Sequence, residues 1–191
     1  MNYEEIIKKA REWAVSEIEK YDSPALLLFE ISEAKALELA EKMNVDKNIV
    51  HLGAILMDIG LGKAKEEGRI LEHTKIGVEL AKEFFKDFDL GKEEENKILN
   101  CIESHHGKVA FESLEAEVCT NADCYRFISP RGVFVFLYHM GKGKEFNFGG
   151  VLDFAEEKMD EKWNILSLDI CKQELEPYYK QFKDLIIKAR E

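Results

Sequence analysis

The sequence predicts an all-α fold, and three observations favour it. Apolar residues recur every three or four positions through most of the 191 residues, the spacing that puts them on one face of a helix. No stretch alternates apolar and polar residues long enough to indicate a paired strand, and the one rival, 133–138, is isolated. The length suits one hydrophobic core. We therefore expect residues 1–191 to form a single helical domain.

The first three helices are expected in the N-terminal third. Residues 3–20 carry an apolar stripe between Glu and Lys residues. The segment 21–24 should end this helix and start the next, with Asp22 or Ser23 as the cap and Pro24 in the first turn. Asp46 should cap a third helix that ends at Asp58. The short turn before Asp46 predicts that the second and third helices are antiparallel neighbours.

The rest of the chain continues the helical pattern after one interruption. Residues 61–70 are charged and contain glycines, and we expect an exposed loop there. Pro177 is expected to kink or break the last helix. The remaining helices are predicted at about residues 72–87, 91–106, 112–127, 150–162 and 167–190.

Composition limits the partners and the compartment. Lys and Arg number 27 and Asp and Glu number 38, for a net charge of −11. This balance argues against DNA or RNA phosphate as the main partner, although a metal could still attract a small phosphorylated ligand. No apolar stretch approaches the roughly 18 residues of a membrane span, and no secretion signal is evident. Four cysteines without CxxC pairing suit a reduced, cytoplasmic protein.

Five polar side chains fall on or beside apolar helical stripes, where burial without a partner is costly. Helices that pack together would bring their stripes, and these side chains, into one interior. Two carboxylates and three imidazoles suit a divalent ion such as Mn, Fe, Zn, Ni, Co or Mg. The five candidate metal ligands are Asp58, His73, His105, His106 and Asp123.

Each candidate ligand also has an ordinary structural explanation. His73 could be a hydrogen-bonded core residue. Asp123 could cap its helix or pair with Arg126, three residues further along the same helix. The metal, the number of ions and the oligomeric state stay open at this point.

Four segments occur in a set order along the chain: VHLGAILMDIG at 50–60, EHTKIG at 72–77, IESHHG at 102–107 and LEAEVCTNADCYRF at 114–127. In this order they resemble the HD-domain superfamily of metal-dependent phosphohydrolases. Members usually carry a first His, a His-Asp pair in an HDIG-like sequence, further histidines, and a distal Asp in an Ala-Asp pair. The resemblance covers about residues 26–128 and implies a helical bundle. Residues 131–190 resemble the C-terminal helical extension of some members.

Two positions depart from the family pattern. Met57 stands where the His of the His-Asp pair is expected, and Leu28 lies near the expected first His. A thioether is a soft, weak ligand for such ions. The resemblance therefore implies that one of the family's two metal positions lacks its two His ligands here, unless Glu30 or Glu33 substitutes as a ligand.

The other position is implied to survive, as Asp58, His73 and His105 with His106 as a further ligand. The resemblance implies hydrolysis of a nucleotide or other small phosphoester by a metal-activated water. Asp58 or Asp123 would orient or deprotonate this water, and Lys63 or Lys108 would hold the phosphate. Two alternatives remain: a catalytically degenerate ligand-binding or interaction protein, and an iron-dependent oxygenase of the same fold.

Overall fold

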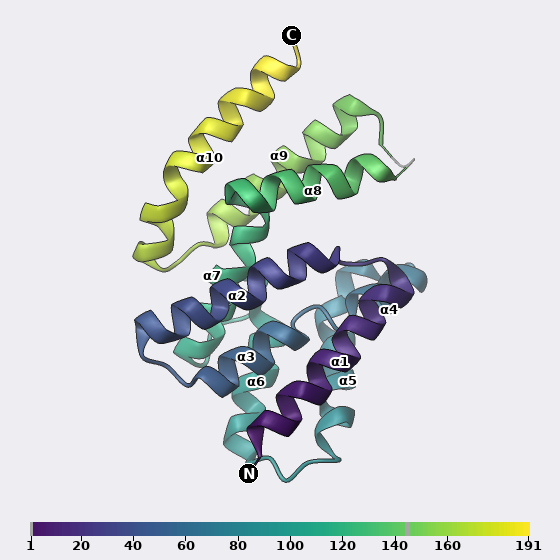
Figure 1. Ribbon diagram of the computed structural model, residues 1–191, viewed down its shortest axis with the longest axis vertical. Coiled ribbons are helices and arrows are strands. Elements are labelled where there is room, and N and C mark those ends of the chain that lie inside the picture. Colours follow the sequence, from purple (N-terminus) through teal and green to yellow (C-terminus); the bar gives the residue numbers. More distant parts are fainter. Residues whose placement is uncertain (1, 144–145) are drawn as a thin grey trace.

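The computed structural model describes residues 2–143 and 146–191, and every regular element in these ranges is a helix. This confirms the predicted all-α fold, and residues 133–138 lie within a helix. Figure 1 shows the elements, whose order is α1 (Tyr3–Tyr21), α2 (Leu26–Met43), α3 (Lys47–Leu56), α4 (Leu61–Glu66), the 3₁₀ turn η1 (Ile70–Glu72), α5 (His73–Phe85), α6 (Lys92–Ser104), α7 (Leu114–Ile128), α8 (Pro130–Lys142), α9 (Phe148–Ile165) and α10 (Asp169–Ala189).

The helix boundaries near the N-terminus follow the capping residues, with one correction. The Asp46 carboxylate accepts hydrogen bonds from the N–H groups of Asn48 and Ile49, so the predicted cap of α3 is confirmed. The predicted start of α2 is wrong. Asp22 adopts the left-handed conformation that ends α1, and Ala25 is the N-cap of α2, which leaves Pro24 outside the helix.

The segment expected as an exposed loop is instead the short helix α4. Gly62 lies against Tyr21, and a Cβ at this position would come within 2.4 Å of a carbon of the Tyr21 ring. The glycine therefore reflects close packing of α4 on α1 rather than a flexible loop. The preceding helix α3 ends at Leu56, two residues earlier than predicted, so Asp58 lies in the turn that joins α3 to α4.

Helix α7 is the central element of the fold. It contacts α2, α3 and α6 on one side and α8, α9 and α10 on the other. In Figure 1, α8–α10 lie together at the C-terminal end of the molecule, above α2, while α3, α5 and α6 lie below it. Side chains near the middle of α7 are therefore available both to the histidine-bearing helices and to the C-terminal extension.

The C-terminal helices have a small apolar cluster of their own, made of Val133, Leu152, Met159, Phe182 and Ile186. Helix α10 runs from Asp169 to Ala189 with Pro177 inside it, so the proline does not divide the helix. Within the described ranges of the chain, the helices are too short or too polar to cross a membrane.

Candidate metal centre

Three histidines meet where α5 begins and α6 ends. His73 is the first residue of α5, and His105 and His106 follow the last residue of α6. The Nδ1–H group of His73 donates to the carbonyl of Ile70 at 2.7 Å, and that of His105 donates to the carbonyl of Ile102 at 2.8 Å. A carbonyl can only accept, so the proton of each neutral ring lies on Nδ1.

His106 is oriented by a carboxylate from the C-terminal extension. Its Nδ1 lies 3.1 Å from Oε1 of Glu161 on α9. Lys162 Nζ also approaches this nitrogen, at 3.3 Å, but the Lys162 ammonium has a closer partner in Asp123, at 2.7 Å. We therefore assign the Nδ1 proton of His106 to the hydrogen bond with Glu161, which leaves its Nε2 as an acceptor as well.

The three Nε2 atoms converge on one point. Nε2 of His73 is 3.4 Å from Nε2 of His105 and 3.0 Å from Nε2 of His106. Lone pairs facing one another at this range repel unless a cation lies between them. Imidazoles whose Nδ1–H groups are fixed by carbonyls or carboxylates are the usual form of metal-bound histidine. The three side chains are thus placed where they could hold a metal ion, and the donor set fits one.

Asp58 lies between this imidazole cluster and a second group of charges. Its Oδ1 is 3.5 Å from Nε2 of His105, and its Oδ2 is 2.6 Å from Nη1 of Arg126. Burial alone would raise the pKa of Asp58, but the Arg126 guanidinium holds it well below its usual range. Asp58 is therefore ionised, with Oδ1 directed at the imidazole cluster and Oδ2 at Arg126.

Asp123 joins the second group rather than the imidazoles. Its Oδ1 is in close contact with Nη2 of Arg126, and its Oδ2 is 2.7 Å from Nζ of Lys162. Burial opposes its charge, and Arg126 and Lys162 outweigh that effect and lower its pKa. The pairing of Asp123 with Arg126, which the sequence left as an alternative, is present.

Glu161 and Lys162 were missed from the sequence, although one pattern points to Lys162. Leu152, Ala155 and Met159 form the buried stripe of α9, and Lys162 continues this stripe at helical spacing. A lysine on an apolar stripe needs a buried anion, and Asp123 is that anion. Glu161 has no comparable signal, because its partner His106 is 55 residues away in the sequence.

The surroundings keep two of the imidazoles neutral at pH 7. Burial lowers the pKa of His106 to about 4, with His105 and Lys162 acting in the same direction and Glu161 opposing them. Burial also lowers the pKa of His73, although Asp58 opposes it. Neutral imidazole is the form that binds metal.

A comparison of the sequence with known families agrees with this geometry. The family model described as the HD domain matches residues 32–127, which is half of the chain. The chain belongs to the HD-domain family. The matched range contains Asp58, His73, His105, His106 and Asp123, and α8–α10 lie outside it.

Several known proteins and structures are similar to different shares of the chain. Ribonuclease Y of Malacoplasma penetrans is 35% identical over 101 residues, which is 52% of this chain but 19% of that protein. The structure of Bacillus subtilis YpgQ in complex with ADP aligns with a TM-score of 0.69 and 19% identity, over 99% of this chain and 95% of the other. A predicted HD superfamily hydrolase from an uncultured Thermotogales bacterium aligns with a TM-score of 0.61 and 17% identity, over 83% and 86%. These structures share the fold, including the region of α8–α10 in YpgQ.

The positions that depart from the HD pattern are filled with core side chains. Met57 is buried in the main apolar core, and Leu28 is buried against Phe136. Glu33, considered as a substitute ligand, is bound by Arg11 at 3.0 Å and contacts His51 at 3.1 Å, which links it to α1 and α3 instead.

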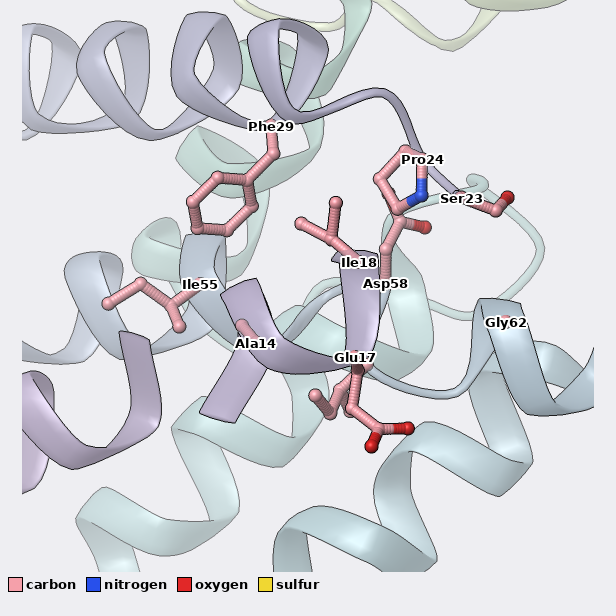
Figure 2. A pocket seen from close by; sticks show the side chains of 10 residues that line it. Ala14, Glu17, Ile18, Ser23, Pro24, Phe29, Ile55, Asp58 and Gly62 are labelled. Carbon is pink, nitrogen blue, oxygen red and sulfur yellow. The ribbon is translucent and has the colours of Figure 1, made fainter. Parts of the chain in front are cut away.

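A small pocket reaches Asp58 from the side of α1 and α2. Figure 2 shows Asp58 with Ile18, Pro24 and Phe29 at this pocket, which has room for about one water molecule. Lys63 lies on α4, half-exposed and 4.0 Å from Glu67, and Lys108 is exposed.

Proposed function

We propose that this chain is a metal-dependent phosphohydrolase that uses one divalent ion. The proposed ligands are Nε2 of His73, His105 and His106 together with Oδ1 of Asp58. The convergence of three Nε2 lone pairs carries the proposal, since each ring already donates from Nδ1. A bound divalent ion supplies Lewis acidity and lowers the pKa of a coordinated water to about 7.

The protein side chains have separate tasks in this proposal. Ile70, Ile102 and Glu161 hold the three rings in the tautomer that presents Nε2. Asp58 has a depressed pKa and is therefore a weak base. We assign it to binding and to orienting the attacking water through Oδ1 rather than to removing the proton of this water.

The proposed substrate is a nucleotide or another small phosphoester. The net charge of −11 disfavours a long nucleic acid, whose binding depends on Lys and Arg contacts to phosphate. YpgQ, which shares the fold over nearly the whole chain, binds ADP. We propose Lys63 and Lys108 as the groups that hold the phosphate, because both belong to segments next to proposed ligands: Lys63 follows Asp58 and Lys108 follows His106.

Hydrolysis of a panel of nucleotides and small phosphoesters tests this function. Chain loaded with Mn²⁺, Co²⁺, Ni²⁺ or Mg²⁺ should release phosphate or a nucleoside product. The variant His73→Asn should lose this activity, and His139→Asn, at the far end of α8, is the matched control that should retain it. A folded, metal-loaded chain without turnover on the whole panel would instead favour a ligand-binding protein, the alternative motivated by the buried Met57 and Leu28.

A further inference from the structure

We infer that Arg126 and Lys162 are built-in cations that take the place of a second metal ion between Asp58 and Asp123, so that the chain holds one ion and not two. The inference rests on the proposed function for the ion at the histidines. It adds a role for two residues outside the ligand set, one on α7 and one on α9.

The charges of this group balance within the protein. Asp123 and Lys162 are 0% and 1% exposed, and Arg126 is 4% exposed. Arg126 bridges Oδ2 of Asp58, at 2.6 Å, and Oδ1 of Asp123, while Lys162 takes the other oxygen of Asp123 at 2.7 Å. Two carboxylates thus face two fixed cations. Buried carboxylates attract metal ions when their charge is uncompensated, and that condition is not met here.

A divalent ion at this position would have to displace both cations. The guanidinium of Arg126 and the ammonium of Lys162 would then be buried without their anions, and each would repel the ion. Buried cations without partners are strongly unfavourable. The two side chains therefore exclude an ion from the space between Asp58 and Asp123.

Arg126 and Lys162 do not block the ligand atoms of the imidazole cluster in the same way. Lys162 approaches His106 at Nδ1, which is on the side of the ring opposite Nε2. Arg126 reaches Asp58 through Oδ2, and Oδ1 stays directed at His105. Arg126 and Lys162 thus neutralise Asp123 and Oδ2 of Asp58. They leave Oδ1 of Asp58 and the Nε2 atoms of the histidines free to bind an ion. Arg126 also acts as a positioning residue, because its bond to Oδ2 turns Oδ1 toward the imidazoles.

Counting bound ions tests this inference. The parent chain, stripped with chelator, is dialysed against Mn²⁺, and bound metal per chain is measured by elemental analysis. We expect one ion in the parent and two in Arg126→Met/Lys162→Met, where the long apolar side chains keep the volume and remove both charges. In the same double variant, adding His73→Asn should lower the count from two to one.

The outcomes separate this inference from the proposed function. Two ions in the parent, or one ion in both the parent and the folded double variant, would overturn the inference and leave the proposed function standing. No ion in the parent but one in the double variant would overturn the proposed function and support the inference, and no ion in either would overturn both. If the double variant does not fold, Lys162→Met replaces it. If neither folds, one ion in the parent supports the inference, and two or none overturns it.

Discussion

The Nε2 atoms of His73 and His106 lie 3.0 Å apart, while each ring is directed at an acceptor through its opposite nitrogen. Two neutral imidazoles in this arrangement have no proton to share. A shared proton would create a charged pair, which burial disfavours, as the lowered pKa values of both rings indicate. The metal ion of the proposed function would remove this repulsion and would bind Nε2 of His105 as well.

Glu161 should strengthen metal binding through His106. The substitution Glu161→Leu removes the acceptor for Nδ1–H and leaves the ring free to turn, so we expect metal affinity to fall by about 10- to 100-fold. Isothermal titration with Zn²⁺ or Mn²⁺ measures this change. Glu157→Leu, on an exposed position of the same helix, is the matched control and should bind like the parent. Equal affinities for the two variants would contradict the assigned role of Glu161.

The metal-free chain should lose stability as the pH falls from about 6.5 to 4. The pKa of His106 is lowered to about 4 in the folded state, so in this window the unfolded chain binds more protons and is favoured. A shift of this size corresponds to on the order of 3 kcal/mol at most. The buried carboxylates contribute only at lower pH, because their folded pKa values lie below the ordinary range.

Urea unfolding in the presence of chelator measures this dependence. His106→Asn should reduce the slope of unfolding free energy between pH 6.5 and 4, and His73, whose pKa burial also lowers, accounts for the slope that is left. A slope in His106→Asn as steep as that of the parent would show that another group causes the loss.

Lys162 should be coupled energetically to Asp123. Lys162→Met leaves Asp123 buried with one of its two cations, and we expect unfolding free energy to fall by about 3–5 kcal/mol. In Lys162→Met/Asp123→Asn the loss should be clearly smaller than the sum of the single losses, as a double-mutant cycle from urea unfolding would show. Strictly additive effects would mean that the two side chains do not interact.

Gly60 should be needed where the turn after Asp58 meets α5. A Cβ at Gly60 would lie 2.3 Å from the carbonyl oxygen of His73 and 2.5 Å from the nitrogen of Gly77. Backbone atoms cannot move aside cheaply, so Gly60→Ala should cost about 1–3 kcal/mol and weaken metal binding. Gly141→Ala, where a Cβ meets nothing within 4 Å, is the control and should be as stable as the parent. Unfolding by urea and metal titration check both.

Local patterns were enough to predict the all-α fold and the start of α3. Apolar spacing and the cap at Asp46 depend on neighbouring residues, and both predictions are confirmed. The sequence does not predict α4, because glycine usually indicates a loop, whereas Gly62 leaves room for the Tyr21 ring of α1. A contact of this kind depends on tertiary packing, which local sequence does not reveal.

Contacts between distant segments also limit what the sequence predicts about the candidate metal centre. His73, His105 and Asp58 were predicted together from the order of the motifs. The role of Asp123 depends on Lys162, which reaches it from α9, in the extension beyond the family match. The position of α9 against α7 decides whether Asp123 faces a metal or an ammonium, and no motif within residues 32–127 contains that information.

Metal binding by the parent chain and two histidine variants is the most direct test of the proposed metal centre. Freshly purified chain, never exposed to chelator, is analysed for Mn, Fe, Co, Ni and Zn and then titrated with the metal that is found, or with Mn²⁺ if the chain is empty. We expect one ion per chain, lost in His73→Asn and retained in His139→Asn. A parent chain that binds no divalent ion, or a folded His73→Asn that binds one with unchanged affinity, would contradict the proposed metal centre.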